Sequence, residues 1–293
     1  MPGPLLVVDA PFLLYRSFFT LPDSIRGADG HPVNALLGAT NNLLRIAADV
    51  SPRAVVVCFG AEQAPYRVEL YAGYHAHRPP MPEDLARQWG QAPELFRSFG
   101  WSVEDAADLE ADDLLGAHAE LEAASGGETL LLTGDRDMYQ CVTDHTHVLY
   151  LKQGTSGFER IDAAEVERRY GIPPTLVPDF IALRGDPSDG IPGAPGIGEK
   201  TAATLLRRHG RLEQLLAAVA DDGGGERPRI VFTLREHAEA LRAYREIALL
   251  RPVAVTRPDD AETDLAGGAA AAAKLGMGAL AGRLEAASSL ADL

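Results

Sequence analysis

The feature that most constrains the fold is the alternation of short apolar runs with helix-like segments in the first half of the chain. The apolar runs are Leu5–Val8, Ala54–Phe59, Thr129–Leu132 and His147–Leu151. The intervening segments with helical spacing are Asn34–Ala48, Glu83–Ser98 and Ala111–Ala123. Strands that alternate with helices and read as continuous apolar runs are typical of a parallel sheet covered on both faces. The sequence therefore predicts an α/β domain over residues 1–161.

The second half of the chain changes to helices separated by short glycine- and proline-rich breaks. The expected helices are Asp162–Arg169, Pro178–Leu183, Gly198–His209, Leu212–Val219, one or two within Arg229–Leu249, and an alanine-rich tail, Gly267–Ala287. Between the last two lies an irregular crossing segment, Arg251–Asp264. We therefore expect a helical domain with a C-terminal helical tail over residues 162–293.

Composition limits the class of protein. With 46% hydrophobic and 24% charged residues, the chain has the balance of an ordinary globular protein. Its two cysteines exclude a disulfide framework and fit a reducing compartment. No stretch approaches the roughly 18 apolar residues of a membrane helix, and no basic segment precedes the first apolar run. We expect a cytoplasmic protein with no membrane partner.

Acidic residues recur after expected strands, near an expected helix start and in a loop between two expected helices. They are Asp9, Glu110, Asp112, Asp113, Asp135, Asp137, Asp186 and Asp189. Any one of them could simply cap a helix or a turn. Because parallel strands deliver their carboxyl ends to one edge of the sheet, however, several should meet there. Clustered carboxylates need cations to stay ionised, and ligands that are all oxygen favour Mg²⁺ or Mn²⁺ over zinc.

Two hard cations about 3.5–4 Å apart can clamp an in-line displacement at phosphorus. The acids therefore indicate a phosphodiesterase or a phosphatase. A haloacid-dehalogenase-type phosphatase would need a second aspartate two positions after Asp9, and Pro11 stands there. That alternative is excluded.

At this point the chain resembles a known family. The segments VVDAPFLLYRSFF, VVVCFG, YRVELYAGYHAHRPPMP, LEADDLL, TGDRDMYQ and ALRGDPSDGIPGAPGIGEKTAATLL follow in order the 5′-nuclease domain of bacterial DNA polymerase I. They equally resemble its stand-alone relatives, the flap endonuclease/5′–3′ exonuclease family. The resemblance implies a PIN-like (resolvase-like) α/β domain with a helix-three-turn-helix module. It also implies a monomer that uses divalent metal to cut 5′ flaps and 5′ ends of duplex DNA in replication and repair.

The resemblance assigns roles to the acids. Around a first metal it places Asp9, Glu110, Asp112 and Asp113, and around a second Asp135, Asp137, Asp186 and Asp189. Asp113 and Asp137 are the two that could act through water. Beside Asp9, the resemblance implies catalytic roles for His75 and Arg78, which would face the attacked phosphate.

Two further elements are expected to bind DNA. The loop Gly193–Ala202 presents glycines and a helix start to phosphate, with Gly196, Gly198, Lys200, Thr201 and Arg207 as its expected contacts. In the family this loop also holds a monovalent cation, so K⁺ is implied near Gly196–Lys200. The other element interleaves aromatic and basic side chains and leads into an expected arch over about residues 62–103. Its expected contacts with DNA are Arg67, Tyr74 and Arg78, and Tyr15, which follows the first acid in the sequence, is expected to join them.

The chain departs from the family pattern at two positions. Gly60 stands where the family has an aspartate, with Glu62 as a candidate substitute, and His75 replaces a lysine. Histidine side chains ordinarily titrate near pH 6.5. A histidine that neutralises a phosphate would therefore lose its positive charge above neutral pH. We expect weaker activity, a preference for Mn²⁺ and a rate that falls with rising pH. Two alternatives stay open: a flap- or junction-binding protein with a weakened nuclease centre, and a PIN-class ribonuclease.

Overall fold

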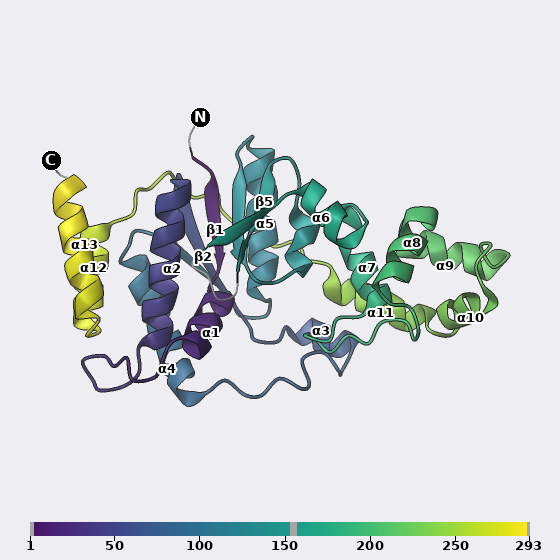
Figure 1. Cartoon of the computed structure of the whole chain (residues 1–293), viewed down its shortest axis with the longest axis horizontal. Helices are drawn as coiled ribbons and strands as arrows, with labels where there is room; N and C mark the ends of the chain where they lie inside the picture. Colours follow the sequence, from purple (N-terminus) through teal and green to yellow (C-terminus); the bar gives the residue numbers. More distant parts are fainter. Residues whose placement is uncertain (1–2, 153–156, 292–293) are drawn as a thin grey trace.

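A computed structural model describes residues 3–152 and 157–291 and contains one central sheet (Figure 1). The ends of the two expected domains, residues 1–2 and 292–293, lie outside the described residues. In chain order the strands are β1 Leu5–Asp9, β2 Ala54–Gly60, β3 Ser102–Ala106, β4 Thr129–Thr133, β5 Thr146–Leu151 and β6 Phe158–Ile161. They lie side by side as β3-β2-β1-β4-β5-β6, and only the β5–β6 pair is antiparallel.

The four expected strands are present, and two edge strands join them. β3 reads SVEDA and is partly exposed, so it lacks the apolar run that marks a buried strand. β6 has four residues and pairs only along β5. Edge strands of this kind need one neighbour and carry polar side chains, which is why the hydrophobic pattern did not reveal them.

Helices cover both faces of the sheet. α1 Ala10–Thr20, α2 Asn34–Val50 and α4 Glu83–Arg97 share one core with Leu6 and Val8 of β1. α5 Ala111–Ala124 lies on the opposite face, where its core includes Leu5 and Val7. The side-chain alternation of a single buried strand thus feeds two cores, as the continuous apolar runs predict.

The helix α4 differs from expectation. We placed it inside an arch over the active site, but its apolar face, including Leu85 and Phe96, is fully buried against α1 and α2. The Gln88 side chain accepts hydrogen bonds from the backbone N–H groups of Ala35 and Leu36, at the start of α2. α4 is therefore part of the body, and the segment free to cover the site is the irregular stretch 71–82.

The helical half lies beside the sheet and begins after β6. Its elements are α6 Ala163–Tyr170, η2 Pro174–Leu176, α7 Val177–Arg184, α8 Glu199–His209, α9 Leu212–Asp221, α10 Pro228–Glu236 and α11 Ala238–Ala248. Two short elements lie near its border with the sheet domain, α3 Pro65–Leu70 and η1 Asp137–Cys141. The expected segment Arg229–Leu249 is thus two helices, and α7, packed against α8 and α11, is buried along most of its length.

The chain then returns to the sheet domain. Residues 251–264 form an irregular crossing segment. Its Arg257 donates hydrogen bonds to Glu122 of α5, which also accepts hydrogen bonds from Arg53, and these contacts attach the segment to the sheet domain. The tail helices α12 Leu265–Lys274 and α13 Gly278–Ala291 pack on each other, and α12 also packs on α4, at the far side from α8–α10 (Figure 1). By its contacts the tail belongs with the first domain, although it follows the helical half in sequence. No helix in the described ranges is long and apolar enough to cross a membrane.

Candidate active site

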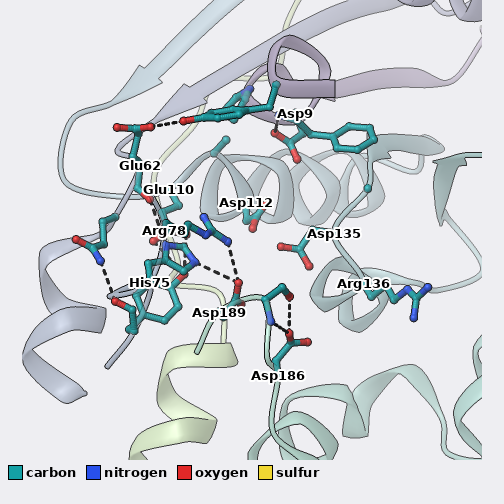
Figure 2. A pocket seen from close by; sticks show the side chains of 18 of the residues that line it. Asp9, Glu62, His75, Arg78, Glu110, Asp112, Asp135, Arg136, Asp186 and Asp189 are labelled. Carbon is teal, nitrogen blue, oxygen red and sulfur yellow. Dashed lines mark hydrogen bonds and ion pairs between the residues drawn. The ribbon is translucent and has the colours of Figure 1, made fainter. Parts of the chain in front are cut away.

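A cavity of about 1330 Å³ opens at the carboxyl edge of the sheet, between the sheet domain and the helical half. Eight carboxylates line it. Six of them come from the segments singled out in the sequence, namely Asp9, Glu110, Asp112, Asp135, Asp186 and Asp189, and the other two are Glu62 and Glu199. Figure 2 shows Asp112 and Asp135 facing Asp186 and Asp189 across this space. The edge of the sheet therefore gathers the acids that the sequence pattern indicated.

The ends of β1 and β4 are tied together by a threonine. The hydroxyl of Thr133 donates to Asp9 Oδ2 at 2.6 Å and accepts from the backbone N–H of Asp135 at 3.0 Å. The other oxygen of Asp9 accepts from Phe12 N at 2.9 Å and so caps α1. Sequence reasoning missed Thr133, although it stands directly before the GD pair in LLTGD.

The start of α5 holds a buried ion pair. Arg67 Nη1 donates to Glu110 Oε2 at 2.6 Å, and Tyr74 also donates to the Glu110 carboxylate. The remaining acceptor position takes the Ala64 N–H at 2.9 Å. Asp113 lies on the same side, 3.6 Å from Arg67, and accepts from the N–H of Arg251 at 2.7 Å. The carboxylates of Glu110 and Asp113 thus already have hydrogen-bond and ion-pair partners within the protein.

The loop between α7 and α8 carries the two acids of the helical half. Asp186 accepts from Arg184 at 3.0 Å and from the Ser188 N–H at 2.9 Å, which folds the turn around it. Asp189 Oδ1 is 3.1 Å from His75 Nε2 and 3.0 Å from Arg78 Nη2. Two side chains of the segment 71–82 therefore bind Asp189, while Asp186 is held by residues of its own loop.

The carboxylates at the centre resist ionisation. Burial, and then the negative charges of Asp135 and Asp9, raise the pKa of Asp112. Burial, and then Asp189, raise the pKa of Asp135 to about 7. Burial also raises the pKa of Asp137 and of Asp9, although the Thr133 hydrogen bond opposes the rise for Asp9. Mutual repulsion of this kind is relieved by bound cations.

The donor set fits hard divalent cations. The acids that line the cavity supply oxygen ligands, and within the described chain the Asp112 carboxylate receives no hydrogen bond or ion pair. No group of three acidic, histidine or cysteine side chains among the described residues is arranged as a ready-made metal site.

Several predicted site residues lie outside the cavity or behind its wall. Asp113 and Asp137 do not line it. Arg67 is 4% exposed and turned to Glu110, so it acts as an internal counter-ion and not as a surface for DNA. Tyr74 lines the cavity but is 2% exposed, and its hydroxyl donates a hydrogen bond to the Glu110 carboxylate.

The two departures from the family pattern have structural consequences. Gly60 ends β2 against the start of α5, where little room remains for a side chain. Glu62 does not turn toward Asp9 and Asp112; it accepts a hydrogen bond from the Tyr15 hydroxyl at 2.6 Å (Figure 2). His75 is buried, adopts a left-handed backbone with φ of 53°, and stacks on Tyr74 at a ring distance of 3.8 Å.

The expected phosphate-binding loop lies beside the cavity. Gly198 caps α8, Gly196 has φ of 80°, and both are exposed along with Lys200. Glu199 in the same turn lines the cavity. Thr201 is half-buried, and Arg207 is exposed two turns further on. The N–H groups at the start of α8 are therefore open to an anion next to the acids.

The fold occurs in solved nucleases. It matches the T5 D15 protein co-crystallised with metal ions, with a TM-score of 0.69, 16% identity and 96% of each chain covered. It also matches the catalytic core of Rad2 in complex with DNA substrate, with a TM-score of 0.62, 16% identity, and 97% of this chain and 90% of that one covered. At these identities the likeness establishes the fold. The shared fold consists of an α/β sheet domain joined to a helical half.

Sequence comparison defines the family. Residues 4–171 match the N-terminal resolvase-like domain of 5′–3′ exonucleases, and residues 172–265 match their C-terminal SAM fold. A 5′–3′ exonuclease of Mycobacterium tuberculosis is 37% identical over 89% of this chain and 88% of its own length. The thermostable DNA polymerase I of Thermus thermophilus is 37% identical over 95% of this chain, which spans 33% of that polymerase. The chain belongs to the 5′–3′ exonuclease family, and it is a structure-specific 5′-nuclease.

Proposed function

We propose that this nuclease hydrolyses phosphodiester bonds of DNA at 5′ flaps and 5′ ends of duplexes, in replication and repair. One observation carries the proposal: four separate chain segments deliver six carboxylates to a single cavity, next to a helix start that can bind phosphate. The T5 and Rad2 structures with the same fold were solved with metal ions and with DNA respectively. DNA is accordingly the proposed partner of the cytoplasmic, monomeric enzyme.

Two divalent cations, Mg²⁺ or Mn²⁺, are the proposed cofactors. Asp9 and Asp112 would hold one, and Asp135, Asp186 and Asp189 the other. Glu110, Asp113 and Asp137 would act indirectly, because the first two are already satisfied by the protein and the third lies outside the cavity. When bound, such cations activate a water and stabilise charge on the leaving oxygen.

The protein's own groups would position the DNA. Arg78 has a half-exposed side chain beside Asp189, where it can bind the phosphate next to the cut, with His75 behind it. Gly196, Gly198, Lys200, Thr201 and Arg207 would grip the duplex backbone without reading bases, with K⁺ at the Gly196–Lys200 loop. Tyr15 lines the cavity and would contact the substrate directly, whereas Arg67 and Tyr74 would contribute by fixing Glu110.

A flap-binding protein with a weakened centre is the second candidate, and the surroundings of Gly60 favour it. The family's aspartate is absent there, and the backbone at the start of α5 occupies the space its side chain would need. Against this candidate stand six retained acids, since a surface built only for binding DNA would lose affinity from them.

Cleavage of a labelled 5′-flap duplex in Mg²⁺ or Mn²⁺ separates the two candidates. We expect wild-type protein to cut near the flap junction, Asp135→Ala to abolish cutting, and Asp144→Ala to behave as wild type. Asp144 is an exposed acid outside the cavity and serves as the matched control. Tight flap binding without cleavage in either metal would establish the second candidate and reject the nuclease mechanism.

A further inference from the structure

An exposed phenylalanine on α1 stands out among the apolar side chains. Phe19 is 71% exposed, whereas Leu13 and Leu14 of the same helix are fully buried. Its ring lines the same cavity as the acids. Phe19 therefore presents a large apolar ring to solvent in the cavity that the acids also line.

The neighbouring rings hold this surface in place. Phe19 is stacked at 27° on Tyr15, with ring centroids 6.4 Å apart, and Tyr15 meets Trp89 edge to face at 6.2 Å. Trp89 in turn packs against the buried ring of Phe59. Phe19 is thus the outermost ring of an aromatic row anchored in the core, and it presents a flat apolar surface to the cavity.

The position along α1 sets what can reach this ring. α1 starts directly after Asp9, and ten residues at about 1.5 Å per residue put Phe19 roughly 15 Å from the acid cluster along the helix. A ligand that spans both places must extend well beyond one nucleotide. Pro79 and Pro80, next to Arg78, line the same cavity from the segment 71–82, so a chain passing between that segment and α1 would meet Phe19.

We propose that Phe19 is a substrate-binding residue on which an unpaired base of the 5′ single strand stacks, more than one nucleotide from the cut. The inference rests on the proposed function. Bases in a duplex already stack on each other, so only an unpaired base offers a free face to an aromatic ring. The aromatic ring of Phe19 would stack on the base, while Arg78 and the cations would bind the phosphates.

The test compares variants on one 5′-flap duplex. We expect Phe19→Ala to raise KM roughly 5- to 100-fold with kcat within about twofold, and Phe19→Trp to retain most of the binding. Phe232→Ala is the matched control, because Phe232 is 68% exposed on α10 and does not line this cavity. Equal kinetics for Phe19→Ala and Phe232→Ala would overturn the inference.

A second measurement identifies the stacked base. Flaps with a single abasic site at successive positions from the junction are bound to Asp135→Asn protein, with and without Phe19→Ala. An abasic site at one flap position should weaken binding to the Asp135→Asn protein. The same abasic site should leave binding to the Asp135→Asn protein that also carries Phe19→Ala unchanged. Equal loss in both at every position would mean that Phe19 touches no base. If wild-type protein cuts no flap at all, the proposed function fails, and the subsite fails with it.

Discussion

Gly60 at the end of β2 lies so close to α5 that a β-carbon on it would come within 2.5 Å of the backbone nitrogen of Ala111. The carbonyl of Leu109 would be 2.6 Å away. Both neighbours are backbone atoms at the start of a buried helix, so they cannot move aside easily. A side chain at this position would therefore overlap the backbone that leads into α5.

We accordingly expect Gly60→Asp to lower the free energy of unfolding without tightening metal binding. Overpacking at such a site costs about 1–3 kcal/mol, and Gly60→Ala should lose a similar amount. Gly90→Ala on α4 is the control, because nothing lies within 4 Å of its added carbon and alanine favours a helix. Urea unfolding and Mn²⁺ titration check this, and tighter Mn²⁺ binding by a stable Gly60→Asp protein would contradict it.

Arg67 gives a second prediction. Its guanidinium is the buried counter-ion of Glu110 and lies near Asp113. Removing it in Arg67→Ala leaves buried carboxylates uncompensated, which typically costs about 3–5 kcal/mol of stability. The exposed Arg168, paired with Glu165, is the control, and Arg168→Ala should leave the urea midpoint in place. A loss below about 1 kcal/mol for Arg67→Ala would show that the cluster does not need this charge.

The central acids predict how stability depends on pH. Burial, followed by the charge of Asp189, raises the pKa of Asp135 to about 7, well above its value in an unfolded chain. Between about pH 4 and 7 the metal-free native protein therefore holds a proton that the unfolded chain has released. The free energy of unfolding consequently falls as pH rises through this range.

Asp135→Asn removes this contribution. In EDTA the variant should gain about 1–3 kcal/mol over wild type at pH 7.5 and little at pH 4.5, measured by urea unfolding. Asp144→Asn should follow wild type at both pH values. A constant difference between Asp135→Asn and wild type across this range would mean that Asp135 ionises normally in the native protein.

Lys200 gives a prediction about DNA affinity. It lies exposed in the first turn of α8, where it can neutralise a duplex phosphate. Lys200→Ala should weaken binding to flaps of unrelated sequence equally and reduce the slope of log K against log salt by about one. Lys274, exposed on α12 and paired with Glu94, is the control and should change neither value. A slope unchanged in Lys200→Ala would place the phosphate contact elsewhere.

Much of the fold followed from local pattern. Apolar runs such as Ala54–Phe59 form buried strands, and their alternate side chains pack into the two cores on opposite faces of the sheet. Such a run can be recognised in the sequence without knowing which strands pair with it. Polar edge strands such as β3 were missed because their stability comes from a single neighbour. α4 was recognised as a helix but assigned to an arch, because the pattern of an amphipathic helix does not say which surface its apolar face meets.

By itself the sequence indicated that Asp9, Asp112 and Asp135 gather at the sheet edge, since each follows a strand or lies at the start of a helix of a parallel α/β fold. Tertiary structure alone decided what each acid does there. Glu110 and Asp113 are satisfied by Arg67, Tyr74 and backbone N–H groups, while Asp112 and Asp135 repel each other. The physical reason is that the order of strands and helices fixes the backbone position of each acid. The ionisation of each carboxylate depends on its burial and on its distances to other charges, and only long-range packing sets these.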